Sequence, residues 1–263
     1  MAYFKVIASG SVIEVYEYEK DPVMTDKTKN DDEKYNQYEK ILLEKDENDW
    51  IHDRGDRVEE RRKQTLREAR NLTRRLALMN FGSGSAFVTL TYPDTRHLTI
   101  DDIDVADDDF KKFMKRLKYK YDRNFKYLAV REFTKRGRIH FHMLIDYEIH
   151  DTSETMIQEL ERLWGRTIWK HGFVDIKPLA DVDNVGAYLI KYMTKDISVE
   201  AFKGHKAYLC SKGLERPLEL RGDEARAVIE AYMLEDKKEV FTNSYISEYL
   251  GTISYKEYNL KRL

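Results

Sequence analysis

The strongest constraint on the fold is the order in which two kinds of segment follow one another from residue 86 onward. Segments rich in β-branched and aromatic residues, which are typical of strands, cover residues 86–92, 125–133, 139–147 and 172–178. Segments with helical spacing of apolar residues cover about 105–121, 153–164 and 183–196. The resulting order predicts an α+β fold, the ferredoxin-like split βαβ arrangement with a central antiparallel sheet and one added helix.

Three further regions surround this pattern. Residues 1–56 are acidic, and from residue 20 they are polar and mostly without period, so we expect a partly flexible N-terminal segment there. The following stretch VEERRKQTLREARNLTRRLALMN has no Gly or Pro and predicts one long helix ending near Asn80. We therefore expect a main domain over 57–220 that includes this basic helix. A C-terminal extension over 221–263 would hold a helix near 223–235 and a strand near 252–259.

Composition excludes several classes of protein. The chain has 263 residues, of which 41% are hydrophobic and 36% charged, and no run of apolar residues is long enough to span a membrane. The N-terminus lacks the basic and apolar regions of a secretory signal. Cys210 is the single cysteine, so neither an internal disulfide nor a cysteine zinc site is possible. We expect a protein of the cytoplasm, with no membrane partner.

The small formal net charge of −2 conceals a segregation of charge along the chain. Residues 57–140 carry a net +9, whereas residues 1–56 carry −7 and residues 141–263 carry −4. A basic central block suggests a surface that meets a polyanion. Charge alone is equally compatible with an ordinary solvated face.

Two histidines and a glutamate form the first candidate site. In a strand, side chains alternate between faces, so His140 and His142 point to one side and Phe141 to the other. Glu132 lies on the preceding strand, across the polar turn TKRGR, and a suitable register would bring its carboxylate within reach of the same ion. Two imidazoles and a carboxylate would leave coordination positions open for a substrate oxygen. The simpler interpretation is a pair of hydrogen-bonded histidines on a half-exposed sheet.

Two overlapping Tyr-x-x-Lys units form the second candidate site. On a helix, Tyr188 and Tyr192 share one face, and Lys191 and Lys195 repeat the same spacing beside them. Nearby lysines and a divalent cation would favour the phenolate and the charge that develops on a phosphate under attack. The simpler interpretation is an amphipathic helix whose tyrosines pack against the sheet.

The motifs FVTLTYPD, Glu132 with GRIHFHMLI, and YLIKYMTK occur in an order that resembles the three motifs of the HUH endonucleases. This superfamily includes the rolling-circle replication initiators of plasmids and single-stranded DNA phages, and the doubled tyrosine unit is similar to their two-tyrosine active sites. The segments WGRTIWKHGFVDIK and YLCSKGLERP also resemble segments of replication-associated proteins. The resemblance covers roughly residues 57–220.

The resemblance implies a role for each residue. Glu132, His140 and His142 would hold one Mg²⁺ or Mn²⁺ at the scissile phosphate. One tyrosine would attack in line, leaving a 5′-phosphotyrosine link and a free 3′-OH, and the other would act when the displaced strand is rejoined. Lys191 and Lys195 would stabilise charge on the phosphate. The residues leave open which of Tyr188 and Tyr192 acts first.

The implied substrate is single-stranded or hairpin origin DNA, whose backbone would follow basic side chains. The candidate DNA-binding residues beside the metal strand are Arg131, Lys135, Arg136 and Arg138. No phosphate-binding loop of the GxxxxGK[ST] type occurs in the sequence, so a host helicase would unwind the duplex and a host polymerase would extend the 3′ end.

Two alternatives remain open. A relaxase or single-tyrosine transposase of the same superfamily uses similar chemistry, although relaxases typically complete the metal site with a third histidine. A catalytically inert ferredoxin-like protein that binds nucleic acid would use the basic residues alone, with both tyrosines in its core. Metal-dependent nicking distinguishes the enzymes from the binder. The oligomeric state is not readable from the sequence.

Overall fold

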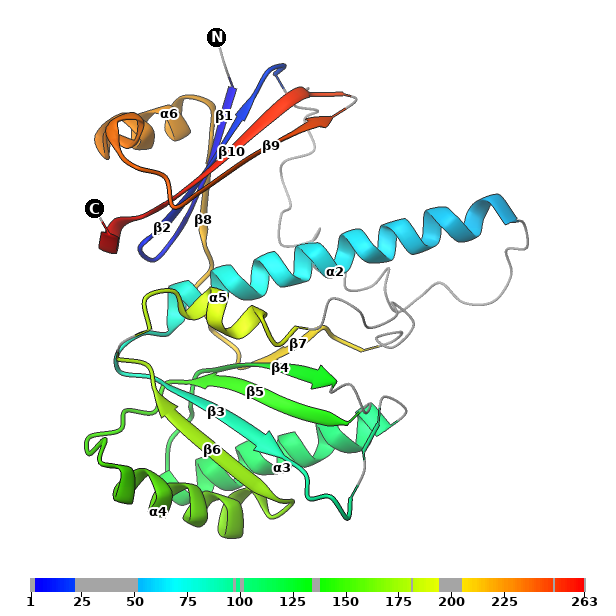
Figure 1. Cartoon of the computed structure of the whole chain (residues 1–263), viewed down its shortest axis with the longest axis vertical. Helices are drawn as coiled ribbons and strands as arrows, with labels where there is room; N and C mark the ends of the chain where they lie inside the picture. The colour runs from blue at the N-terminus through cyan, green and yellow to red at the C-terminus, as the bar shows by residue number, and fades with distance from the viewer. Residues whose placement is uncertain are drawn as a thin grey trace. The chain divides into compact units, whose positions relative to one another are not determined.

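The computed structural model describes residues 3–21, 52–96, 98–99, 102–133, 138–180, 182–193, 205–247 and 249–262, with the backbone alone for 52–60. The chain divides into two compact units, one formed by Met1–Lys45 with Arg216–Leu263 and the other by Asp46–Glu215 (Figure 1). The second unit holds every predicted site residue.

The second unit is built around a five-stranded antiparallel sheet. Its strands run in the spatial order β6, β3, β5, β4, β7, so that the sequence neighbours β4 and β5 form a hairpin at its centre. The strands are β3 (Ala86–Thr91), β4 (Tyr127–Phe133), β5 (Ile139–Ile145), β6 (Phe173–Pro178) and β7 (Tyr208–Cys210).

One face of this sheet packs against α3 (Ile103–Tyr121) and α4 (Glu154–Trp164), which lie together on the same side in Figure 1. A π-helical turn, η2 (Gly165–Trp169), continues α4. Phe110 and Phe113 of α3 pack against Phe141 of β5, and Trp164 and Trp169 are fully buried in the same cluster. Large aromatic rings at this density supply most of the apolar area that is removed from water on folding.

The opposite face of the sheet is covered in part by α2 (His52–Asn80) and α5 (Val185–Ile190). Leu76 and Ala77 of α2 and Leu189 of α5 are buried against Phe87 and neighbouring sheet residues. Gly186 sets the distance between the two helices, because a Cβ atom there would lie 2.5 Å from the carbonyl oxygen of Arg74. Only glycine allows the backbone of α5 to approach α2 this closely.

The first unit joins the two ends of the chain in a second antiparallel sheet, with the spatial order β8, β1, β2, β10, β9. Its strands are β1 (Tyr3–Ser9), β2 (Val12–Tyr18), β8 (Leu218–Arg221), β9 (Phe241–Ser247) and β10 (Gly251–Asn259). Helix α6 (Gly222–Ala231) packs on one face through Ala225 and Ile229, next to Val6, Ile13 and Tyr258. The short 3-10 helices η4 (Leu234–Asp236) and η5 (Leu260–Arg262) follow α6 and β10.

The structure confirms an α+β fold and the predicted order of strands and helices from residue 86 to 190. The long helix ends at Asn80 as predicted, and the extension holds the expected helix and strand near the C-terminus. Two features differ from the sequence interpretation. Residues 3–18 form strands β1 and β2, and they pair with strands of the C-terminal extension rather than standing as a separate segment. Helix α5 ends at Ile190, so Tyr192 lies beyond it in a turn.

Candidate metal centre and active site

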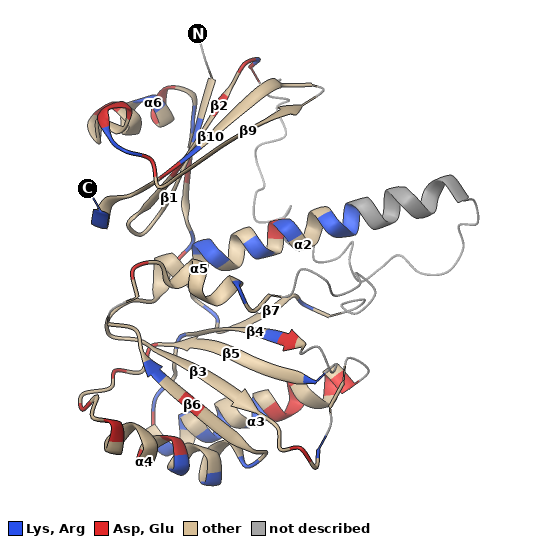
Figure 2. Cartoon of the chain, in the orientation of Figure 1, with Lys and Arg blue, Asp and Glu red and all other residues tan. Residues whose placement is uncertain are grey.

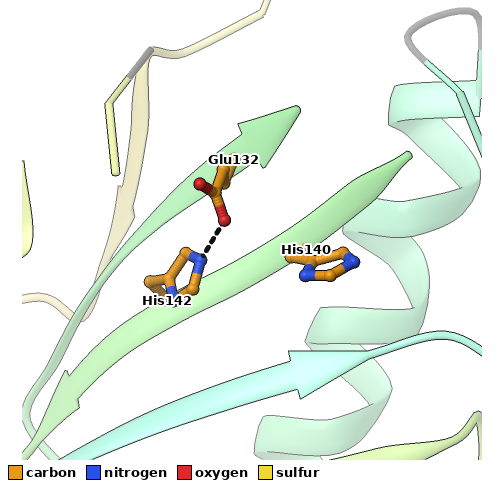
Figure 3. Close-up of side chains that lie close together, drawn as sticks. All are labelled: Glu132, His140 and His142. Carbon is orange, nitrogen blue, oxygen red and sulfur yellow. Dashed lines mark hydrogen bonds and ion pairs between the residues drawn. The ribbon is translucent and has the colours of Figure 1, made fainter. Parts of the chain in front are cut away.

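The register of the β4–β5 hairpin places the three predicted metal ligands together. Glu132 lies directly opposite His140, and His142 follows on the same face two residues further along β5. The ligand atoms of the three side chains all lie within 4.8 Å of one another (Figure 3). The sequence left this register open, and the structure gives the one that brings the carboxylate to the imidazoles.

His142 is the most enclosed of the three residues, with 4% of its surface exposed. Its Nε2 forms a hydrogen bond of 2.7 Å with Oε2 of Glu132, and its Nδ1 lies 3.2 Å from Oγ1 of Thr89 on β3. Its ring is stacked at 3.7 Å on that of Tyr192 and at 5.7 Å on that of Phe87, measured between ring centroids. The imidazole is therefore held at both nitrogens and in contact with two aromatic rings.

Burial lowers the pKa of both imidazoles below the ordinary value of about 6.5. Glu132 opposes this effect at both histidines, whereas Arg138 reinforces it at His140 and Lys191 reinforces it at His142. Both rings are therefore neutral at pH 7. A neutral imidazole has a lone pair for a metal ion, so the protonation state is the one that coordination requires.

The donor set fits a divalent metal ion. Two neutral imidazoles and a carboxylate converge from adjacent strands, and three protein ligands leave positions open to water or substrate. The outer nitrogen of His142 is held by the Thr89 hydroxyl, which can accept from Nδ1–H and so leave Nε2 free for a metal. Sequence reasoning missed Thr89, although its position in FVTLT, on a strand that could pair with β5, was an available signal.

Both predicted tyrosines lie beside this cluster. Tyr188, on α5, meets Phe87 edge-on with 4.7 Å between ring centroids, and Tyr192 lies 6.1 Å from Tyr188 by the same measure. Burial raises the pKa of Tyr188 above its ordinary value, with a further contribution from its contact with Tyr192, while Lys191 and Lys177 act in the opposite direction. The two phenols thus share one aromatic cluster with the candidate metal ligand His142.

Lys191 lies over the ring faces of both tyrosines. Its Nζ is 3.9 Å from the ring centroid of Tyr188 and 4.7 Å from that of Tyr192. An ammonium group over an aromatic face is stabilised by the ring quadrupole. Lys195, the other predicted lysine, lies outside the described residues.

Helix α2 fixes the backbone just after the tyrosines. Nη1 of Arg70 donates a hydrogen bond of 2.5 Å to the carbonyl of Met193. The helix belongs to the basic block, and Figure 2 shows Lys and Arg recurring along its described part. One of its arginines is therefore a structural anchor for the turn that follows α5, a role that the sequence did not indicate.

Arg131 occupies a position that does not support the predicted contact with DNA. It is 2% exposed and lies on the opposite face of β4 from Glu132. Its Nε donates to Asp107 Oδ1 at 2.7 Å, its Nη2 donates to Oδ2 of the same carboxylate, and its Nη1 donates to the Lys206 carbonyl at 2.6 Å. All three nitrogens are occupied inside the protein, since strand alternation sends this side chain toward α3.

The other predicted DNA-binding residues lie at or near the turn of the hairpin. Arg138 is at the surface, where its Nη1 forms an ion pair with Asp94 in the loop after β3. Lys135 and Arg136 lie outside the described residues. Within the described part of the hairpin, Arg138 is the predicted cation that remains close to the open end of the metal cluster.

Fold and site together define an α+β protein with a three-ligand candidate metal centre beside two tyrosines. Residues 85–197 match a family model described as a replication-associated protein of the ORF2 type. The match includes both clusters and leaves α2 and the whole first unit outside it. It supports a replication-associated protein. No curated protein and no solved structure matches the chain.

The helices of the described residues do not meet the requirements of a membrane span. None of them combines the length and the apolar character that crossing a bilayer needs.

Proposed function

We propose that the chain is a rolling-circle replication initiator that nicks single-stranded origin DNA and later rejoins the displaced strand. The observation that carries the proposal is the stacking of Tyr192 on His142, inside the segment that matches the replication-associated family. It sets a nucleophilic side chain against a candidate metal ligand. The order β3-α3-β4-β5-α4-β6 and the spatial order of its strands support the ferredoxin-like HUH arrangement predicted from the sequence.

Each residue has a role in this chemistry. Glu132, His140 and His142 hold the cation, and Mg²⁺ or Mn²⁺ bound there supplies positive charge to a non-bridging oxygen of the scissile phosphate. The phenol oxygen of Tyr188 or Tyr192 loses its proton and attacks phosphorus in line. The bond from phosphorus to the 3′ oxygen breaks, and that oxygen takes up a proton to become the 3′-OH.

The product of this step is a 5′-phosphotyrosine ester. It keeps the energy of the phosphodiester bond, so a second attack by a 3′-OH rejoins DNA without ATP. Lys191, over both rings, favours the phenolate form of whichever tyrosine attacks. In this proposal a host helicase separates the strands and a host polymerase extends the free 3′ end.

Characterisation of the products of cleavage tests the proposal. End-labelled single-stranded oligonucleotides are incubated with the protein and Mn²⁺, with an EDTA sample as the control. We expect a 3′ end that a polymerase extends and a 5′ end that stays blocked to phosphatase and kinase until protease digestion. The double variant Tyr188→Phe/Tyr192→Phe should abolish cleavage, whereas Tyr119→Phe, at a residue 90% exposed on α3, should leave it unchanged.

A second candidate is the inert nucleic-acid-binding protein, and one observation favours it. Tyr188 and Tyr192 both pack against Phe87 and belong to the apolar cluster under α2 and α5. In that case both tyrosine-to-phenylalanine variants bind DNA like the wild type, and the wild type cleaves no oligonucleotide with any divalent ion.

A further inference from the structure

A row of side chains crosses the sheet from the metal ligands to its edge. Glu132 of β4 pairs with His140 of β5, His140 pairs with Thr91 of β3, and Thr91 pairs with Phe173 of β6. Directly paired residues of an antiparallel sheet point to the same face, and adjacent strands lie about 4.8 Å apart. Phe173 therefore lies on the face that bears the candidate metal centre, about 10 Å across two strands from His140.

The burial pattern of β6 supports this orientation. Val174 and Ile176 are buried in the core with α3 and α4, whereas Phe173, Asp175 and Lys177 are exposed on the other face. Phe173 is the extreme case, because 72% of its surface is accessible. A single exposed phenylalanine is ordinary on a protein surface. Its place at the end of the row of metal ligands is what calls for a function.

The backbone beneath the ring is fixed. Gly172 has φ +134°, and a Cβ atom there would lie 2.2 Å from the Thr91 carbonyl oxygen, so the chain enters β6 in close contact with the end of β3. The same carbonyl accepts a hydrogen bond of 3.2 Å from Nε1 of the buried Trp169. A ring on so constrained a backbone loses little entropy when a ligand covers it.

Polar groups continue along the same face of the edge strand. Asp175 follows Phe173 by two residues and pairs with Thr89, the residue that contacts His142. Lys177 Nζ lies 3.1 Å from Asp175 Oδ2, and about half of each side chain is exposed. An aromatic ring followed by an acceptor and a donor offers a flat apolar face together with hydrogen-bonding groups at its edge.

We propose that Phe173 is a stacking platform for one unpaired nucleobase, the base adjoining the phosphate held at Glu132, His140 and His142. This inference rests on the proposed function, because it takes single-stranded DNA as the ligand. Exposed aromatic rings beside a phosphate-binding site bind single strands by stacking, and every base has the required face. Asp175 and Lys177 lie where the edge of that base would face the protein.

The test measures affinity separately from cleavage. Fluorescence anisotropy gives the Kd for a labelled single-stranded oligonucleotide in EDTA, where no cleavage occurs. We expect Phe173→Ala to weaken binding about tenfold, the size of one stacked base, and Phe173→Trp to restore it. Tyr119→Ala removes a ring that is 90% exposed on α3, against the opposite face of the sheet, and should leave the Kd unchanged.

A series of oligonucleotides with one abasic position each completes the test. One position should reproduce the tenfold loss in the wild type and cause no further loss in Phe173→Ala, because the ring and the base form one contact. Equal Kd values for wild type and Phe173→Ala, with covalent adduct still formed in Mn²⁺, overturn the stacking site and leave the nickase intact. Absence of both DNA binding and adduct in the wild type overturns both proposals.

Discussion

The phenol ring of Tyr192 lies almost parallel to the imidazole of His142, with 3.7 Å between ring centroids and 19° between ring planes. The contact joins the turn after α5 to the central strand β5, so the predicted nucleophile and a predicted metal ligand support each other's position. Removing the ring and removing only its hydroxyl should therefore have different effects.

Substitutions of Tyr192 separate packing from chemistry. Tyr192→Phe keeps the stacked ring, so we expect Mn²⁺ affinity like that of the wild type. Tyr192→Ala removes the ring from His142 and should weaken Mn²⁺ binding several-fold, because the imidazole loses one of its two stacking partners. Isothermal titration with Mn²⁺ measures both. Equal affinities for Ala and Phe would show that the stacking does not position the ligand.

Thr89 should act on the metal through His142. We expect Thr89→Val to lower Mn²⁺ affinity about tenfold or more, because the valine cannot hydrogen-bond Nδ1. Thr89→Ser keeps a hydroxyl and is the matched control, with affinity close to that of the wild type. A valine variant that binds Mn²⁺ normally would remove Thr89 from the account of the site.

Arg131 should contribute to stability rather than to DNA binding. Its guanidinium and Asp107 form a pair in which the Arg131 side chain is 1% exposed, so Arg131→Met leaves a largely buried carboxylate without its partner. We expect a loss of about 3 kcal/mol in the free energy of unfolding. Arg138→Met, at the surface pair with Asp94, should change stability by less than about 0.5 kcal/mol. Urea unfolding compares them, and similar stabilities would argue against the buried pair.

The rate of adduct formation should rise with pH when Tyr188 is the sole candidate phenol, as in the variant Tyr192→Phe. The pKa of Tyr188 is raised by burial, so the reactive phenolate is a small fraction at neutral pH and grows about tenfold per pH unit below that pKa. The pKa values of His140 and His142 are lowered, so both are already neutral and add no slope above pH 7. A rate independent of pH between 7 and 9 would exclude this phenol as the attacking group.

Local sequence patterns were sufficient for the core of the second unit. Runs of β-branched and aromatic residues predicted the strands, and the short polar turn predicted the hairpin that carries Glu132 and His140. The alternation of faces along a strand, applied to Arg131 beside Glu132, already sends the arginine to the opposite face and into contact with α3. The register itself depends on contacts across the hairpin, which a pattern along one strand does not specify.

Long-range pairing explains what the sequence did not reveal. Strands β1 and β2 gain partners more than two hundred residues away in β8 and β10, and no local propensity indicates such pairing. Helix α5 is shorter than its apolar spacing predicted, since the turn at Tyr192 is held by the His142 ring and the next residue, Met193, by Arg70 of α2. Phe173 and Thr89 acquire significance only through their neighbours across the sheet.

The central claim is that a tyrosine beside the Glu132, His140 and His142 cluster forms a covalent bond with DNA, and mapping that bond tests it most directly. The protein is incubated with single-stranded oligonucleotides and Mn²⁺, the denaturant-resistant adduct is digested, and the nucleotide-bearing peptide is sequenced by mass spectrometry. The account predicts a phosphotyrosine at Tyr188 or Tyr192, and no adduct in EDTA or in His142→Gln. A link at any other residue, or an adduct that forms without metal, would contradict it.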